Sequence, residues 1–182
     1  LAPGSAIIKQ SAASEELLAH EGIVEVFDNL EDLANRIDSD DLNVTKDSIL
    51  LLKNIGPIGA PGMPEAGLIP IPKKLAKQGV KDMVRISDGR MSGTAAGTII
   101  LHVCPEAAAG GTLDIVESGD IIKLDVNKRL LELKLSDEEI STRKKSKKSN
   151  TEIKRRGYDK IFHESVLQAD KGADFDFLRP VK

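Results

Sequence analysis

Short apolar runs recur along the first part of the chain, and each has the length of a β-strand with turn residues beside it. The runs are Ala6–Lys9, Ile23–Phe27, Ser48–Asn54, Asp82–Ser87 and Thr98–Val103. Further on, the apolar stretch 113–135 is divided by the turn sequences ESGD and VNKR, which predicts three antiparallel strands. Strands therefore dominate the predicted secondary structure.

Helical spacing is confined to segments that lie between or after these strands. Residues 29–38 place apolar side chains at helical spacing behind Asn29, a residue type that caps helices. The segment PIPKKLAKQG ends at Gly79, as a short helix does, and the segment SDEEISTRKK begins with Ser136 and Glu139 at the spacing of a capping box. We therefore predict a strand-rich α/β fold with a few flanking helices.

The C-terminal part differs in composition from the rest. Residues 143–156 are dominated by Lys and Arg without interleaved aromatic residues, which favours a solvated helix end running into a loop over a nuclear-targeting or nucleic-acid-binding segment. Residues 157–178 combine helical apolar spacing with an aromatic and acidic end, and we expect them to dock on this domain or on a neighbour. The predicted organisation is a domain over residues 1–142, followed by a basic linker and docking tail over residues 143–182.

The length of 182 residues suits one domain with a tail. The chain starts at Leu1 rather than at a methionine, and its first residues resemble the approach to a strand. We therefore expect it to be a piece of a longer polypeptide.

The composition narrows the classes of partner. The net charge is −3, so the chain as a whole does not attract a phosphate backbone. Only 3% of the residues are aromatic, so few side chains are available to stack on bases. No apolar run is long enough to cross a membrane. Cys104 is the only cysteine, which excludes an internal disulfide and a cysteine-ligated zinc or iron–sulfur centre within this chain alone. We expect a protein of a reducing, cytoplasmic compartment with no nucleic-acid or membrane partner.

The loop GPIGAPGMPEAG, residues 56–67, is the first candidate for a functional site. Seven of its twelve residues are glycine or proline, so the loop is stiff and its backbone can approach other groups closely. Glu65 is its only charged residue, and hard cations such as magnesium bind carboxylate oxygen. Alternatively, Pro64 and Glu65 start a helical turn, with an acid near its positive end. The glycines match no phosphate-binding pattern, because no Lys-Ser/Thr pair follows them.

The stretch SDGRMSGT, residues 87–94, is the second candidate. It follows a predicted strand and presents Ser92 at the tip of a turn with little side-chain bulk around it. The exposed hydroxyl can serve as a nucleophile, as a base, or as the N-cap of a helical turn that begins at Thr94. A serine hydrolase is disfavoured, because the Gly-x-Ser-x-Gly pattern is missing and no histidine is close in sequence. We interpret His102, in an apolar strand, as a core histidine with a satisfied ring.

Three motifs in a fixed order, GPIGAPGMPE, SDGRMSGT and LHVCPEAAAGG, resemble the C-terminal domain of the dihydroxy-acid and sugar-acid dehydratase family. The resemblance runs from LAPGSAIIKQSAAS at the start to VLQADKGADFDFL near the end, so it covers nearly the whole chain. Within the family, Met91, Thr94, the PIPKKL segment and the LQADKGADFDFL tail are more similar to the pentonate dehydratases than to the branched-chain amino-acid enzymes. Gly89 instead matches the branched-chain pattern.

The resemblance implies a fold, a reaction and cofactors. The fold is a swivelling β/β/α domain with a barrel-like, strand-rich core. The reaction is the removal of water from a 2,3-dihydroxy acid to give a 2-keto-3-deoxy acid. In the family, magnesium holds the substrate carboxylate and 2-hydroxyl, and an iron–sulfur cluster acts as a Lewis acid on the departing 3-hydroxyl. By this resemblance Ser92 is the base at C2, Thr94 lies at the substrate and Glu65 is a magnesium ligand, whereas Cys104 matches no cluster cysteine and is interpreted as a buried strand residue.

The resemblance also implies partners. The cluster cysteines and the other magnesium ligands belong to the family's N-terminal domain, so we expect this chain to be inactive alone and the full-length enzyme to be a homo-oligomer. Two alternatives stay open: a branched-chain dihydroxy-acid dehydratase, and a binding module that keeps the fold without catalysis. Arg90 is expected either to meet a substrate carboxylate or to pair with Asp88 or another acid.

Overall fold

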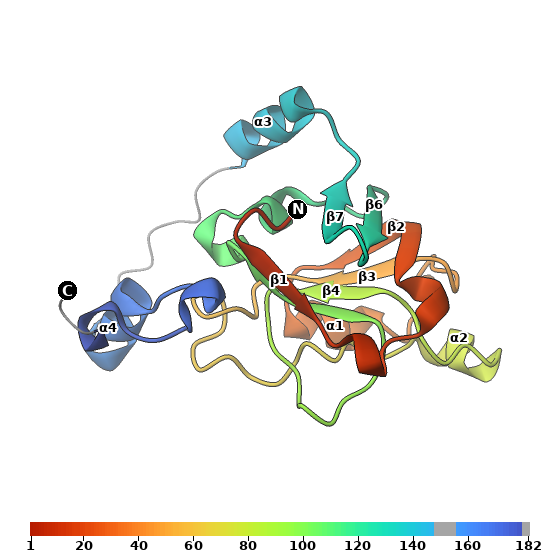
Figure 1. Ribbon diagram of the computed structural model, residues 1–182, viewed down its shortest axis with the longest axis horizontal. Helices are drawn as coiled ribbons and strands as arrows, with labels where there is room; N and C mark the ends of the chain where they lie inside the picture. The colour runs from red at the N-terminus through yellow and green to blue at the C-terminus, as the bar shows by residue number, and fades with distance from the viewer. Residues whose placement is uncertain (148–155, 180–182) are drawn as a thin grey trace.

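The computed structural model describes residues 1–147 and 156–179, which form one seven-stranded sheet in the order β1-β5-β4-β3-β2-β6-β7. The strands are β1 (Ser5–Ile8), β2 (Ala19–Phe27), β3 (Ile49–Leu52), β4 (Arg85–Ser87), β5 (Ile99–Cys104), β6 (Ile121–Asp125) and β7 (Leu130–Leu133). Strands β2 to β5 are parallel, whereas β1, β6 and β7 run antiparallel to their neighbours. The sheet curls into a half-barrel (Figure 1), which confirms the predicted strand-rich α/β fold.

Helices occur where the sequence predicts them. They are α1 (Leu30–Arg36), α2 (Lys73–Lys77), α3 (Asp137–Ser146) and α4 (Gly157–Ser165). The Asn29 side chain accepts a hydrogen bond from the Asp32 N–H at 2.9 Å and so caps α1. Ser136 and Glu139 form the expected capping box at the start of α3. Just beyond α2, Gly79 has the left-handed backbone conformation (φ 88°) that glycine adopts readily at helix ends.

One predicted strand is wrong. The first of the three strands expected over residues 113–135 is instead a 3₁₀-helix, Thr112–Ile115. The buried ammonium group of Lys53 donates hydrogen bonds to the carbonyl oxygens of Asp114 at 3.0 Å and Val116 at 2.6 Å. Because a side chain satisfies these carbonyls, the segment needs no neighbouring strand, while its apolar side chains are still buried in the core.

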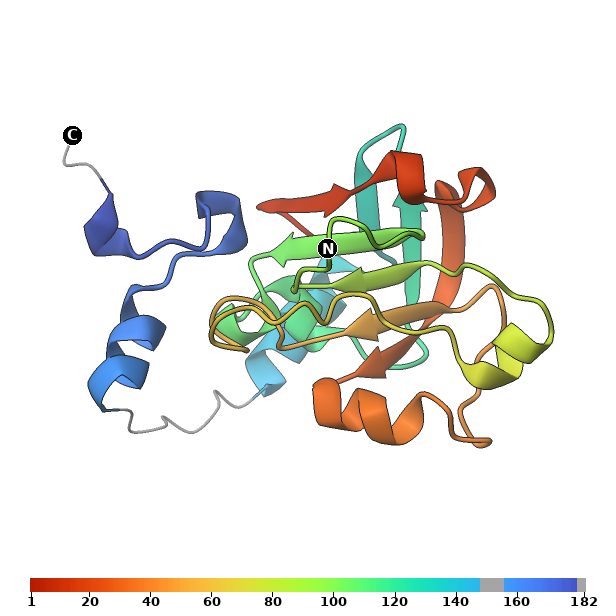
Figure 2. The same cartoon turned by 90° about the horizontal axis from the view of Figure 1, so that it is seen from below.

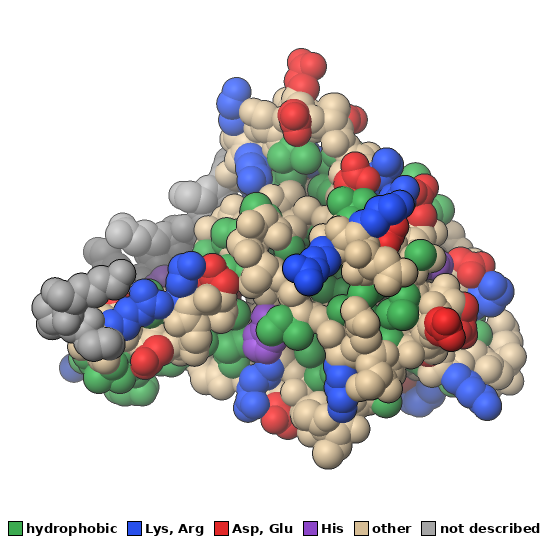
Figure 3. Space-filling view, viewed as in Figure 1, with side chains coloured by type: hydrophobic (Ala, Val, Ile, Leu, Met, Phe, Trp, Pro, Cys, Tyr) green, Lys and Arg blue, Asp and Glu red, His purple; other side chains and the backbone are tan. Residues whose placement is uncertain are grey.

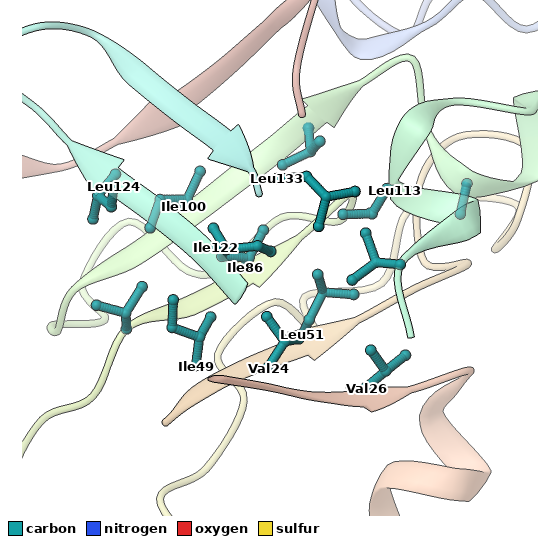
Figure 4. Close-up of a cluster of buried hydrophobic side chains, with 14 of the residues drawn as sticks. Val24, Val26, Ile49, Leu51, Ile86, Ile100, Leu113, Ile122, Leu124 and Leu133 are labelled. Carbon is teal, nitrogen blue, oxygen red and sulfur yellow. The ribbon is translucent and has the colours of Figure 1, made fainter. Parts of the chain in front are cut away.

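Both faces of the parallel strands are buried, which explains why β3 is apolar at every position. Ile49 and Leu51 belong to a cluster on the concave side of the sheet, where side chains from the parallel strands meet those of β6 and β7 (Figure 4). Leu50 and Leu52 belong to a second cluster on the opposite face, which includes residues of α1 and α2. Burying an aliphatic side chain of this size contributes about 1.5–3 kcal/mol. The strands therefore form a firm base for the loops at their ends.

The C-terminal tail returns to the sheet after residues 148–155. These residues make up much of the predicted basic loop and lie outside the described residues. Its short 3₁₀-helix η5 (Ala169–Lys171) lies near the end of β5 (Figure 2). There, Cys104 Sγ lies 3.2 Å from Asp170 Oδ1. The tail thus contacts this domain, which is one of the two docking surfaces expected from the sequence. The predicted boundary at residue 142 falls inside α3, and the division into domain and tail stays a prediction.

Charged side chains of both signs are mixed on one face of the molecule. On the face shown in Figure 3, Lys and Arg side chains are interspersed with Asp and Glu side chains. Within residues 1–147 and 156–179, no helix is long and apolar enough to cross a membrane.

Candidate active site

Three loops meet at the carboxyl edge of the parallel strands. Residues 53–67 follow β3, residues 88–98 follow β4, and residues 105–111 follow β5. Neighbouring parallel strands end at the same edge of a sheet, which is where open α/β sheets place their ligands. The two motifs singled out from the sequence are therefore neighbours in space.

Asp88 connects all three loops. Its side chain is fully buried, and its carboxylate accepts hydrogen bonds from the backbone N–H groups of Asn54 at 3.1 Å, Ile55 at 2.9 Å and Ala107 at 3.0 Å. Burial raises the pKa of Asp88 to about 6; the three N–H donors oppose the rise, and the charge of Glu106 adds to it. At neutral pH Asp88 is therefore mainly an ionised anchor for the loops.

Glu106 is a second buried carboxylate that fastens loops, with 1% of its surface exposed. It accepts hydrogen bonds from the N–H groups of Ile58 and Gly59, both at 2.9 Å, and from the side-chain amide of Gln168 at 2.7 Å. The Gln168 carbonyl oxygen in turn accepts a bond from the Glu106 N–H at 2.9 Å. A Cβ atom on Gly56 would lie 2.6 Å from the Glu106 carboxylate, so only glycine permits this approach. The anchor joins the C-terminal tail to the loop that carries Glu65.

Arg90 bridges the two loops that carry the predicted site residues. Its Nη1 lies 3.0 Å from Glu65 Oε1, and its Nε donates to the Met63 carbonyl oxygen at 2.6 Å. The Arg90 carbonyl oxygen accepts a hydrogen bond from the Gly67 N–H at 2.7 Å. Arg90 was expected to meet a substrate carboxylate or to pair with Asp88 or another acid, and in the structure it pairs with another acid, Glu65. Glu65 starts no helix, so the alternative interpretation of this residue as a helix beginning is wrong.

Ser92 and Thr94 lie on the adjacent turn, with Ser92 half-buried and Thr94 exposed. Their hydroxyl oxygens are 3.0 Å apart and hydrogen-bonded. The turn is held from the β1 side by Lys9, whose ammonium group donates to the Gly93 carbonyl oxygen at 2.7 Å. No helix begins at Thr94, so Ser92 is not a helix cap. In the described part of the chain no histidine or carboxylate bonds the Ser92 hydroxyl, and a catalytic triad is therefore absent there.

Glu65 and Cys104 differ in how well they fit the expected cofactors. The Glu65 side chain is 49% exposed and presents anionic oxygen from a stiff loop, so it fits as one ligand of a hard divalent cation. Among the residues that the structure describes, no three His, Cys, Asp or Glu side chains gather as a metal site. Cys104 is buried in β5, as predicted, and burial raises the pKa of its thiol. A single buried thiol does not fit an iron–sulfur cluster, which several thiolates hold.

His102 differs from its interpretation as a satisfied core residue. It has the left-handed φ of 52° inside β5, and its Nδ1 is buried without a hydrogen-bond partner in the described regions. Burial, and then the charge of Arg90, lower the pKa of the imidazole, so the ring is neutral at pH 7. The expectation of a satisfied ring was wrong. The residue borders a cavity of about 380 Å³, whose lining also includes Met63, Arg90, Phe162 and Val166.

Sequence reasoning missed the anchors Asp88, Glu106 and Gln168. For Asp88 and Glu106 a signal existed, because Asp88 stands directly beyond a predicted strand and Glu106 stands close behind the apolar strand β5. Gln168 carried no such signal, since 62 positions separate it from Glu106.

The chain has clear relatives among known proteins. A family model described as Dihydroxy-acid/6-phosphogluconate dehydratase C-terminal matches residues 1–173. The chain is 58% identical over 178 residues to a dehydratase named IlvD1 of Rhizobium meliloti (strain 1021) and 48% identical over 179 residues to L-arabinonate dehydratase of Rhizobium leguminosarum bv. trifolii (strain WSM2304). It is 40% identical over 174 residues to dihydroxy-acid dehydratase of Archaeoglobus fulgidus. These alignments cover 98%, 98% and 95% of the chain and 31% of each relative.

The fold and the comparisons together place the chain among the C-terminal domains of a family whose named members are dehydratases. The chain belongs to the dihydroxy-acid/6-phosphogluconate dehydratase family, and it spans about a third of the length of the curated relatives it matches. Relatives named for sugar acids match it at higher identity than those named for dihydroxy acids, 48% against 40%.

Proposed function

We propose that this chain is the C-terminal part of a sugar-acid dehydratase, which removes water from a 2,3-dihydroxy acid such as a pentonate. The observation that carries the proposal is the bridge formed by Arg90, which brings the Glu65 loop beside the Ser92 turn. The higher identity to the sugar-acid enzymes supports the substrate class. In this proposal an N-terminal domain completes the site, the chain alone is inactive, and the whole enzyme is a cytoplasmic homo-oligomer.

Ser92 Oγ, as an alkoxide, takes the proton from C2 of the substrate. The electron pair of the broken C2–H bond forms a double bond to C3, and the C3 hydroxyl leaves and is protonated to water. The resulting enol takes up a proton at C3 and loses the proton of its 2-hydroxyl group to become the 2-keto-3-deoxy acid, so the reaction needs no oxidant or reductant. Thr94 Oγ1, 3.0 Å from Ser92 Oγ, donates a hydrogen bond that holds the alkoxide and orients it toward the substrate.

A serine hydroxyl alone is too weakly acidic to be ionised near neutral pH. A magnesium ion held by Glu65, with further ligands from the rest of the enzyme, would lower the cost of the alkoxide and of the negative charge that develops on the substrate. Arg90 positions the Glu65 carboxylate for this role through the contact at 3.0 Å. An iron–sulfur cluster would be held by the N-terminal domain, because the single thiol of this chain does not fit one.

Two substitutions in the full-length enzyme that contains this chain test the proposal. Ser92→Ala should reduce turnover of L-arabinonate by about 10³-fold, in the range of a lost general base, and leave magnesium binding unchanged. Glu65→Gln should raise the magnesium concentration for half-maximal turnover about tenfold, since one charged ligand is lost. Ser11→Ala, an exposed serine outside the site, is the matched control for Ser92.

The outcomes separate the alternatives. Full turnover by the Ser92 variant would remove this residue from the role of base, and an unchanged magnesium dependence would remove Glu65 from the metal site. Turnover of 2,3-dihydroxyisovalerate but of no pentonate would favour the branched-chain dehydratase. An enzyme inactive on both acids would favour a binding module that has kept the fold.

A further inference from the structure

His102 combines three uncommon features beside the candidate active site. Its φ of 52° lies in a region that residues other than glycine rarely adopt, and it occurs within a strand. Its backbone N–H donates to the Gly89 carbonyl oxygen at 3.0 Å, which ties this strained residue to the Ser92 loop. Its buried Nδ1 has no partner in residues 1–147 and 156–179. Strained backbone and unpaired polar atoms are concentrated at functional sites, because elsewhere they only lower stability.

The His102 ring is best described as a neutral hydrogen-bond donor. A proton on Nδ1 would be a buried N–H without an acceptor, so the proton of the neutral ring belongs on Nε2. Burial, and then the charge of Arg90, lower the pKa of the ring and so disfavour a second proton. His102 therefore offers one N–H at Nε2 and carries no charge.

The cavity that His102 borders has the character of a small-molecule site. Its volume is about 380 Å³, and it lies between the Glu65 loop, Arg90 and the C-terminal tail. Its lining is mostly apolar and includes Pro57, Met63, Phe162, Val166, Ala169 and Ala173. Apolar walls with a few placed polar groups are typical of sites that orient a small ligand. Arg90 and His102 are the polar side chains among these lining residues, and Arg90 already binds Glu65 and the Met63 carbonyl oxygen.

Resting on the proposed function, we propose that His102 is a specificity-determining residue whose Nε2–H donates a hydrogen bond to a hydroxyl group of the sugar acid beyond C3. The Ser92 loop meets His102 at Gly89, whose carbonyl oxygen accepts the His102 N–H at 3.0 Å, and Arg90 of the same loop lines the cavity. In this proposal C2 of the substrate therefore lies at Ser92 and its distal carbons lie in this cavity. A branched-chain dihydroxy acid carries only alkyl groups beyond C3 and cannot accept this bond. A site with a donor for a substrate hydroxyl discriminates strongly against an analogue that lacks the hydroxyl.

The test is the substitution His102→Asn in the full-length enzyme that contains this chain. Asparagine tolerates the left-handed φ, and its short side chain does not reach the position of Nε2. We expect kcat/KM for L-arabinonate to fall about tenfold, mainly through KM, as for the loss of one neutral hydrogen bond. For 2,3-dihydroxyisovalerate, kcat/KM, or the inhibition constant if it is not turned over, should change less than about twofold. His20→Asn is the matched control, because His20 lies at the opposite end of the parallel strands and its Nε2 bonds the Asp47 carbonyl oxygen at 2.9 Å.

The outcomes distinguish this inference from the proposed function. A parent enzyme that processes no sugar acid overturns the proposed function, and the inference with it, before any variant is compared. A parent active on L-arabinonate, together with a variant of unchanged selectivity, overturns the inference alone. Equal losses on both acids would also overturn it, because they indicate a structural role. If His102→Asn does not fold, His102→Gly decides by the same comparison, since glycine adopts this φ without strain.

Discussion

Replacing Asp88 with asparagine tests whether one buried carboxylate fastens three loops. The carboxylate accepts N–H bonds from Asn54, Ile55 and Ala107. Asparagine keeps one acceptor oxygen but turns an NH₂ group toward at least one of these donors. A buried donor left without an acceptor costs about 1–3 kcal/mol, so we expect a loss of at least that size at pH 7.5.

The expected loss depends on pH. Burial, as the main cause, raises the pKa of Asp88 to about 6 from 3.8. The folded state therefore binds this proton more tightly than the unfolded state, and the resulting stabilisation is full below the unfolded pKa and lost as the pH rises through the folded pKa. At pH 5, one unit below the folded pKa, protonation of Asp88 raises the ratio of folded to unfolded protein about elevenfold relative to pH 7.5. This corresponds to about 1.4 kcal/mol in the free energy of unfolding. Asparagine does not titrate, so the stability advantage of the parent over Asp88→Asn should grow by about this amount between pH 7.5 and pH 5.

Urea unfolding at pH 7.5, 6 and 5 measures the difference directly, because the other titrating groups are common to both proteins. Asp125→Asn is the control: Asp125 lies in β6, away from the three loops, and hydrogen bonds from Lys128 lower its pKa. Its difference from the parent should stay flat over this range, since its stabilisation is lost only at lower pH. A parent advantage over Asp88→Asn that is constant, or that shrinks toward pH 5, would refute the assignment of a raised pKa to Asp88.

Two further substitutions address the packing of the loops. Gln168→Ala removes a partner of buried Glu106, so we expect a loss of about 1–3 kcal/mol and faster amide hydrogen exchange in residues 53–67; unchanged exchange would contradict the anchoring role. Gly67→Ala places a Cβ 2.8 Å from a backbone oxygen of the Ser92 loop and should lower the free energy of unfolding by about 1–3 kcal/mol. Gly93→Ala is the control and should be neutral, because the space around its Cβ is open. Equal melting temperatures for the two variants would argue against close packing of the loops.

The elements that the sequence predicted correctly depend on local signals. The uninterrupted apolar run of β3 predicts a strand buried on both faces, and the structure confirms it. Asn29 before α1, and the Ser136–Glu139 spacing before α3, predict helix beginnings because the capping bonds form within one turn. Such interactions involve neighbours in sequence, so they can be recognised without the fold.

The errors depend on partners that are distant in sequence. Lys53 bonds carbonyls 61 and 63 positions away, and a segment with the pattern of a strand becomes a 3₁₀-helix. For Arg90 the sequence left open which acid it pairs with, and the fold selects Glu65 on another loop over Asp88, two residues before it. Likewise the orphan nitrogen of His102 follows from the packing around β5, which its apolar neighbours in sequence do not reveal.

The candidate site was predictable as a set of motifs but not as an arrangement. The glycine-rich stretches marked the Glu65 loop and the Ser92 turn, and the parallel order of β3 and β4 places them together. The hydrogen bond between Ser92 and Thr94 becomes visible only in three dimensions. The roles of Ser92, Thr94 and Glu65 in the reaction stay predictions, and the substitutions proposed above test two of them.

The anchoring of the loops by Asp88 and Glu106 has a consequence for protein engineering. Both carboxylates bind main-chain N–H groups, which every amino acid except proline possesses. The identities of the side chains at Asn54, Ile55 and Ile58 therefore matter little for these bonds. Segments of equal length from other members of the family could replace this stretch without redesign of the sheet beneath it, if the glycines and the buried Ile55 are retained.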